Sequence, residues 1–129
     1  MPSPLEILPV SKSILTVDDS PSMRMLLRIA LTDLGYRVTE AEDGIDALEK
    51  LADETPDLLI TDINMPNLDG FGLIERVRGK GERSLPILVL TTESSDEKKQ
   101  RARSAGATGW IVKPFDPDKL HAAIRRVLH

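Results

Sequence analysis

The sequence predicts an α/β fold of three layers, in which a doubly wound sheet of five parallel strands lies between helices. Three observations lead to this prediction. Strand-like and helix-like segments alternate five times along 129 residues, the connections between them are short, and the strand-like runs are too short for typical helices. Such alternation is typical of parallel sheets with helices on both faces. Right-handed crossovers leave few topologies, and ligands bind where the winding switches direction.

The first unit is a strand over 13–17 followed by a helix that continues to about residue 34. The strand ends in Asp18-Asp19, and Ser20-Pro21 then supplies an N-cap with proline at the first helical position. Gly35 is the expected stop of the helix. Apolar residues at steps of three and four predict its inner face, which consists of Met23, Leu27, Ala30 and Leu34.

The second unit is a strand over 36–41 in which Tyr36 and Val38 alternate with polar residues, as in an edge strand. Asp43 is placed to cap the helix that follows. Pro56 breaks the chain before the next strand. The buried side of the helix is predicted to carry Ile45, Leu48 and Leu51.

The third unit contains the most informative stretch of the chain, residues 58–66. An apolar run ends abruptly in Asp62, and Pro66 limits how far a regular element can continue. This pattern predicts a buried strand that holds a carboxylate at its C-terminal tip. The next helix is expected to begin at Asp69-Gly70 and to end near Gly79, with an inner face of Phe71, Ile74 and Val77.

The fourth and fifth units complete the sheet. Residues 87–90 form a wholly apolar run that ends in Thr91-Thr92-Glu93, and residues 110–112 form a strand that ends in Lys113-Pro114. The first, third and fourth strands are the most apolar and are expected at the centre of the sheet, with the Tyr36 and Trp110 strands outside them. The two remaining helices are capped by Ser95 and by Asp116-Pro117. Their predicted inner residues are Ala102 and Ala105 in the first, which Gly106 ends, and Leu120, Ile124, Val127 and Leu128 in the second.

Composition narrows the classes of function. The chain suits one domain over 12–129, after a lead-in over 1–11 that is expected to be disordered because it contains three prolines. It contains no cysteine and only two histidines, His121 and His129, so thiolate chemistry and His-rich metal sites are excluded. A net charge of -4 with no basic run disfavours nucleic-acid binding. Membrane insertion and a signal peptide are not expected either.

Polar residues follow four of the predicted strands and should meet at one edge of the sheet, namely Asp18, Asp19, Asp62, Thr91 and Lys113. Three ionised carboxylates close together repel one another unless a cation intervenes. Hard oxygen donors without histidine or cysteine favour Mg²⁺. A lysine and a hydroxyl beside them suit an anionic group. The set is typical of a phosphoryl-transfer site with a carboxylate nucleophile.

Each of these residues taken alone has a structural explanation. Asp18 and Asp19 could be helix caps, as Asp43 is predicted to be, Thr91 could be an ordinary strand end and Lys113 a surface lysine. However, Asp18 and Asp19 are adjacent and precede a better cap in Ser20, so one cap does not explain both. Lys113 directly follows an apolar strand and precedes Pro114. Their joint occurrence favours the functional interpretation.

The same residues resemble the receiver domain of two-component response regulators, over about residues 12–128. The matching motifs are Asp18-Asp19, Asp62 with Met65-Pro66 and Asp69-Gly70, Thr91, and Lys113-Pro114-Phe115. The resemblance implies a flavodoxin-like fold with strand order 2-1-3-4-5, as in the CheY-type receivers.

The resemblance also implies roles for the residues at the strand tips. Asp62 would accept the phosphoryl group, as an acyl phosphate. Asp19, Asp62 and the backbone carbonyl of Asn64 would hold Mg²⁺, with Asp18 contributing mainly through a water. Lys113 would hold the phosphoryl oxygens, or pair with Asp62 before phosphorylation.

Four further roles come from the resemblance. Thr91 would turn towards the phosphoryl group. Trp110 stands where the family usually has tyrosine or phenylalanine as the switch aromatic, and it is either a moving switch or a partly exposed aromatic on an edge strand. Asn64 and Glu93 would tune how water reaches the acyl phosphate, which implies fast self-dephosphorylation. The alternative is that both are solvent-facing loop residues.

The implied function is that of a CheY-like, cytoplasmic, monomeric chemotaxis regulator. Its partners would be a CheA-like histidine kinase, the flagellar motor switch and a phosphatase, and it would catalyse only its own phosphorylation and dephosphorylation. Because the chain ends at His129, no output domain is expected, and the polar segment 94–104 is either a docking surface or a solvated helix. Two alternatives remain. One is a phosphorelay intermediate or phosphate sink, which would exchange phosphoryl groups with a phosphotransfer protein. The other is a phosphatase enzyme, disfavoured because Asn64 replaces the second aspartate of the Asp-x-Asp motif.

Overall fold

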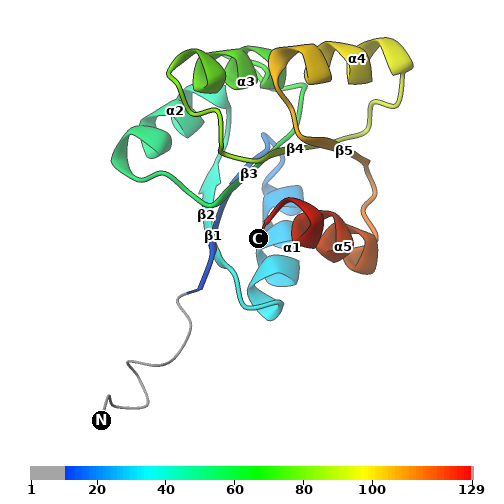
Figure 1. Ribbon diagram of the computed structural model, residues 1–129. Coiled ribbons are helices and arrows are strands. Elements are labelled where there is room, and N and C mark those ends of the chain that lie inside the picture. Colours follow the sequence, from blue (N-terminus) through cyan, green and yellow to red (C-terminus); the bar gives the residue numbers. More distant parts are fainter. Residues whose placement is uncertain (1–10, 129) are drawn as a thin grey trace.

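The computed structural model describes residues 11–128, which form a five-stranded parallel sheet between two layers of helices (Figure 1). The strand order is β2-β1-β3-β4-β5, so the predicted topology is confirmed. The strands are β1 (Ser13–Val17), β2 (Arg37–Ala41), β3 (Leu58–Thr61), β4 (Ile87–Thr91) and β5 (Gly109–Val112). The helices are α1 (Pro21–Asp33), α2 (Gly44–Asp53), α3 (Gly70–Gly79), α4 (Asp96–Ala105) and α5 (Pro117–Val127).

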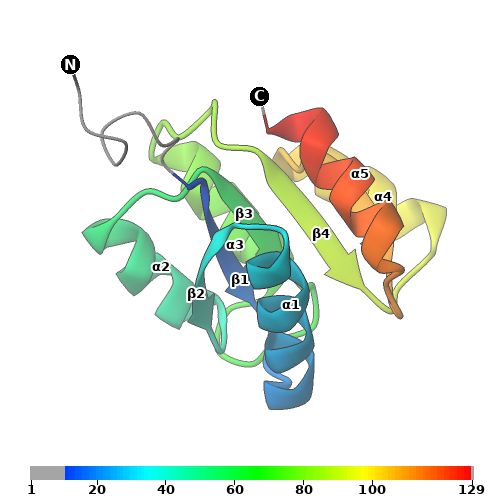
Figure 2. The same cartoon turned by 90° about the horizontal axis from the view of Figure 1, so that it is seen from below.

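The helices divide between the two faces of the sheet. In Figure 1, α2, α3 and α4 lie above the sheet, and α1 and α5 lie below it. Figure 2, seen from below, places α1 and α5 in front of the strands. The winding therefore changes direction between β1 and β3, as expected for a doubly wound sheet.

The core consists of two apolar clusters, one on each face, because successive side chains of a strand point to opposite faces. On β3, for example, Leu58 and Ile60 pack with α1 and α5, whereas Leu59 packs with α2, α3 and α4. β1 and β4 alternate in the same way. The buried apolar residues of β1, β3 and β4 on the α1 and α5 side are Ile14, Leu58, Ile60, Leu88 and Leu90. Those on the other side are Leu15, Val17, Leu59, Ile87 and Val89.

The edge strands differ from the central strands as predicted. Every residue of β3 and β4 is buried, whereas β2 alternates exposed and half-buried positions before Ala41 and β5 is at most half-buried. A central strand buried on both faces is held on either side by its neighbours. The residues that follow β1, β3 and β4 are therefore held in rigid positions.

The predicted helix starts are confirmed by hydrogen bonds. The side chains of the four predicted caps, Ser20, Asp43, Ser95 and Asp116, accept a backbone N–H from the first turn of their helices. Asp69, where the third helix was predicted to begin, caps α3 in the same way. The stop of α4 is also confirmed, because Gly106 has a φ of 118°, a left-handed conformation that only glycine adopts without strain.

The prediction that Leu34 and Ile45 lie on the inner faces of their helices was wrong. Leu34 is 39% exposed, because α1 ends at Asp33 and Leu34 is its C-cap rather than part of its inner face. Leu31, one turn beyond Leu27, fills the inner position and is fully buried. Ile45 is 40% exposed in the first turn of α2, where Ala47 faces the core instead.

Within residues 11–128 no helix has the length and apolar character needed to cross a membrane. Residues 1–10 of the predicted lead-in, and His129, lie outside the described residues.

Candidate functional site

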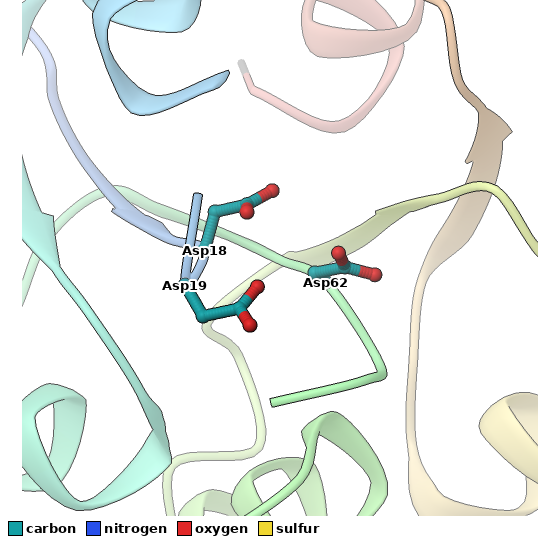
Figure 3. Close-up of side chains that lie close together, drawn as sticks. All are labelled: Asp18, Asp19 and Asp62. Carbon is teal, nitrogen blue, oxygen red and sulfur yellow. The ribbon is translucent and has the colours of Figure 1, made fainter. Parts of the chain in front are cut away.

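Three carboxylates meet at the carboxyl ends of β1 and β3. Asp18 and Asp19 follow β1, Asp62 follows β3, and each offers an oxygen within 4.8 Å of the others. Figure 3 shows the three side chains gathered beside these two strand ends. The Asp62 N–H donates to the Val17 carbonyl at 2.9 Å, which extends the β1–β3 pairing to the tip. Asp18 and Asp62 are buried and Asp19 is exposed.

Lys113 reaches into this cluster from the end of β5. Its Nζ donates to Asp18 Oδ2 at 2.7 Å and to Asp62 Oδ2 at 2.8 Å. The Lys113 side chain is only 10% exposed. Its backbone N–H donates to the Thr91 carbonyl at 2.7 Å, so the sheet fixes the point from which the ammonium approaches.

The charges of the cluster act on the pKa of Lys113. Burial by itself lowers this pKa, but the hydrogen bonds and negative charges of Asp18 and Asp62 outweigh it, so the pKa is raised above the ordinary lysine value. The ammonium therefore stays protonated and provides a fixed positive charge beside Asp62.

The second oxygen of each buried carboxylate is also engaged. Asp18 Oδ1 accepts from the Ser20 N–H at 2.9 Å, and Asp62 Oδ1 accepts from the Ile63 N–H at 2.6 Å. The loop after Asp62 packs tightly against the start of α3, where a Cβ on Gly70 would collide with the Asp62 carbonyl oxygen. Glycine is therefore required at the first position of α3 to keep Asp62 in place.

Thr91 and Trp110 lie at the other side of the site, on β4 and β5. Thr91 is fully buried, and its Oγ1 accepts from the Glu93 N–H at 3.3 Å. Trp110 is half-buried, and its Nε1–H donates to the Glu93 carbonyl at 3.1 Å. Glu93 therefore connects the strand-end threonine with the aromatic residue of the edge strand.

Asn64 and Glu93, which were predicted to act together, are in contact. Asn64 Nδ2 donates to Glu93 Oε1 at 3.1 Å. Lys98 Nζ forms an ion pair with the same oxygen at 2.9 Å. Hydrogen bonds from Lys98 and Asn64 lower the pKa of Glu93, so the carboxylate is ionised at neutral pH.

The structure thus gathers the predicted site residues around the carboxyl ends of the strands. Asp18, Asp62 and Lys113 form a floor, with the exposed Asp19 beside it. Asn64 and Glu93 form a rim, and Thr91 and Trp110 contact Glu93 from β4 and β5. Sequence reasoning missed two residues that contact them. One is Lys98, which lies in the predicted polar segment without a predicted contact. The other is Arg24, whose Nη1 donates to the Asp18 carbonyl at 2.6 Å. The spacing of Arg24, six residues after Asp18 and on the first helix, was the available signal for that contact.

The donor set fits a small divalent cation. Three carboxylates face a single lysine, so excess negative charge remains at the site, and all the available ligand atoms are hard oxygens. Asp19 is free of any hydrogen bond within the described residues and is exposed enough to bind an ion that arrives from solvent.

A doubly wound sheet with an acidic cluster and an adjacent lysine at its carboxyl edge defines the class of receiver domains. The chain belongs to the response regulator receiver domain family, whose model matches residues 14–125.

Individual relatives extend this assignment. Over 92% of its length the chain superimposes on all of the Vibrio cholerae chemotaxis protein CheY4, with a TM-score of 0.88 and 45% identity. It is 41% identical to the response regulator MprA of Mycobacterium tuberculosis, over 92% of this chain and 51% of that protein. It is also 44% identical to the sensor protein EvgS of Escherichia coli, over 88% of this chain but 9% of that protein. The chain therefore spans about half, or less, of the curated relatives that it matches.

Proposed function

We propose that this receiver accepts a phosphoryl group on Asp62 from a histidine kinase, and that the phosphorylated form is its signalling state. The observation that carries the proposal is Lys113, whose Nζ binds both Asp18 and Asp62 in a largely buried position. An ammonium held there neutralises the floor before transfer and is within reach of a phosphoryl oxygen afterwards.

The proposed step is a direct displacement at phosphorus. Asp62 Oδ attacks the phosphorus of a phosphohistidine, an O–P bond forms and the P–N bond breaks, and the departing imidazole nitrogen keeps the electron pair. In hydrolysis a water attacks the same phosphorus, the bond to Asp62 breaks, and inorganic phosphate and the carboxylate are released. Lys113 stabilises the charge on the phosphoryl oxygens in both steps.

Asp18, Asp19, Asp62 and the backbone carbonyl of Asn64 would hold Mg²⁺. When bound, the ion would neutralise negative charge on the carboxylates and on the phosphoryl oxygens. Around this site, Thr91 would bind a phosphoryl oxygen through its hydroxyl, and Trp110 would respond through the residue that both contact, Glu93.

For the output we propose a chemotaxis role in which the phosphorylated protein binds the flagellar motor switch. The support is the match to CheY4, which this chain covers completely, together with Asn64 and Glu93, which CheY-type receivers share. The same proposal includes a CheA-like kinase and a phosphatase as partners. It also includes a receiver domain over residues 12–129 that acts as a monomer.

A second candidate is a phosphorelay intermediate or phosphate sink. The receiver segment of the sensor protein EvgS is as similar in sequence as the regulators are. A receiver domain of a histidine kinase from Syntrophus aciditrophicus also superimposes, with a TM-score of 0.85 and 32% identity. Such receivers occur in kinases, where a phosphoryl group passes onward.

One experiment tests the acceptor and then separates the two outputs. Wild type and Asp62→Asn are incubated with phosphoramidate and Mg²⁺, and incorporation is measured by intact-protein mass spectrometry. Wild type should gain one phosphoryl group and the variant none, and incorporation in both would contradict the assignment of Asp62. The phosphorylated wild type is then offered a motor-switch peptide and, separately, a histidine phosphotransfer protein. Binding of the peptide supports the chemotaxis role, whereas phosphoryl transfer to the histidine without peptide binding supports the relay.

A further inference from the structure

We infer that Lys98 is a positioning residue that sets the lifetime of the phosphorylated state by fixing the carboxylate of Glu93 at the rim of the site. This inference rests on the proposed acceptor role of Asp62. It assigns a specific contact to a helix for which the sequence indicates either a docking surface or a solvated face.

The contact is defined by one shared acceptor atom. Glu93 Oε1 forms an ion pair with Lys98 Nζ at 2.9 Å and accepts a hydrogen bond from Asn64 Nδ2 at 3.1 Å. The ion pair and the hydrogen bond act on the same oxygen and together restrict the orientation of the carboxylate. The position of the Asn64 amide, two residues after Asp62, therefore depends on a lysine of α4.

Lys98 projects from a fixed point of the backbone. It is the third residue of α4, and its N–H donates to the Oγ of the N-cap Ser95 at 3.2 Å. The cap thus holds the turn from which the lysine side chain reaches Glu93. Lys98 does not stabilise the helix, because a cation in the first turn faces the positive end of the helix dipole. The two preceding residues, Asp96 and Glu97, are the acidic residues that this end favours.

Glu93 is also the residue through which the rest of the rim is connected. Its N–H donates to Thr91 Oγ1, and its carbonyl accepts from Trp110 Nε1. With Lys98 and Asn64 on the side chain, Glu93 has a contact with β4, β5, α4 and the loop after β3. A lysine that fixes this side chain acts on the path by which water approaches Asp62.

The direction of the effect follows from the contact. Without the ammonium, Glu93 loses one of its two donors, and Asn64 loses a fixed partner. Side chains that restrain the attacking water then become mobile, and hydrolysis of the acyl phosphate slows. We expect a two- to fivefold longer lifetime, about the rate equivalent of an ion pair at this level of exposure.

The test compares Lys98→Gln with Lys98→Arg and with Lys99→Gln. Each protein is phosphorylated with phosphoramidate and Mg²⁺, the donor is removed, and loss of the phosphoryl group is followed by mass spectrometry. Lys98→Gln should show the longer lifetime, and Lys98→Arg should restore the wild-type rate. Lys99→Gln removes the same charge one residue away, from a side chain with no ion pair among residues 11–128, and should decay like wild type.

A variant that lacks the Glu93 carboxylate tests whether Lys98 acts through it. In Glu93→Ala, the further change Lys98→Gln should leave the lifetime unchanged, because Lys98 acts only through that carboxylate. The inference is overturned if Lys98→Gln decays like wild type, if Lys99→Gln is slowed equally, or if the effect persists without Glu93. Absence of incorporation in wild type would instead overturn the proposed function itself.

Discussion

Two lysines bind carboxylates at the same end of the sheet, one at the floor of the site and one at its rim. At the floor, the side chains of Lys113, Asp18 and Asp62 are 10%, 2% and 10% exposed. At the rim, Lys98 and Glu93 are 41% and 30% exposed. The N–O distances of the two ion pairs are nearly equal, so the pairs differ mainly in their exposure to solvent.

That difference assigns the two pairs to different tasks. Removing one partner of a buried pair leaves an uncompensated charge without water, so the floor needs Lys113, or another cation, to exist in its present form. Solvent replaces either partner of an exposed pair at little cost. The rim is therefore free to vary in strength and to influence a rate without endangering the fold.

The largest expected effect is that of Lys113→Met in metal-free buffer. The change keeps the length of the side chain and removes the charge, which leaves Asp18 and Asp62 facing each other. We expect a loss of about 3 kcal/mol in the free energy of unfolding, measured by urea denaturation. A loss below about 1 kcal/mol would show that solvent already compensates these carboxylates, and the contrast between floor and rim would then disappear.

Mg²⁺ should stabilise the folded protein, because the three carboxylates exceed the single lysine in charge. At ten times the Kd, a ligand that binds only the folded state adds about 1.4 kcal/mol, seen as a higher melting temperature. Asp19→Asn removes an exposed ligand and should weaken the shift without lowering stability in metal-free buffer. An equal shift in both proteins would place the ion elsewhere.

Asp43 extends the comparison to a carboxylate that is held without a lysine. It accepts from the Asp46 N–H at 2.8 Å and from Asn67 Nδ2 at 2.7 Å, and these hydrogen bonds lower its pKa. Asp43→Ala should cost about 1 kcal/mol at neutral pH, as expected for a lost N-cap.

The pH dependence of this cost has a definite sign. Because the pKa of Asp43 is lower in the folded than in the unfolded protein, its stabilisation is complete above the unfolded value and is lost as the pH falls through the folded one. Urea denaturation of both proteins should therefore show a difference that narrows below about pH 4. A difference that is constant down to pH 2 would mean that the charge of Asp43 plays no part.

The smallest expected effect on stability is that of Lys98→Gln. The pair is exposed, so the urea midpoint should remain at the wild-type value even though the phosphoryl lifetime changes. A clear fall in the midpoint would mean that the rim, like the floor, is part of the framework of the fold.

The floor of the site was predictable from sequence, and the rim was predictable only in part. Asp62 and Lys113 end apolar strands, and the pairing of parallel strands brings such ends to one edge of the sheet. Their place at this edge follows from the backbone pairing of the strands. In contrast, no periodicity in the sequence predicts the contact of Lys98 with Glu93. This contact depends on how a long side chain leaves the first turn of a polar helix.

The same distinction explains the errors in the predicted inner faces of the helices. Leu34 and Leu31 both continue the apolar spacing of α1 from Leu27 or Ala30, and only the end of the helix at Asp33 decides which of them packs. Ile45 fits the spacing of α2 but lies exposed in its first turn, whereas Ala47 is fully buried. Periodicity identifies a face, whereas the ends of the element decide how far that face is covered.

Trp110 has a consequence for measurement. It is the only tryptophan of the chain, and its indole N–H is bound to the carbonyl of Glu93. Selective excitation of this residue therefore gives an optical signal from one place, next to the carboxylate that Lys98 and Asn64 hold. The emission maximum and quantum yield should follow the state of the rim in real time, without a label. The protein thus carries its own fluorescent probe for the kinetics of the proposed phosphorylation cycle.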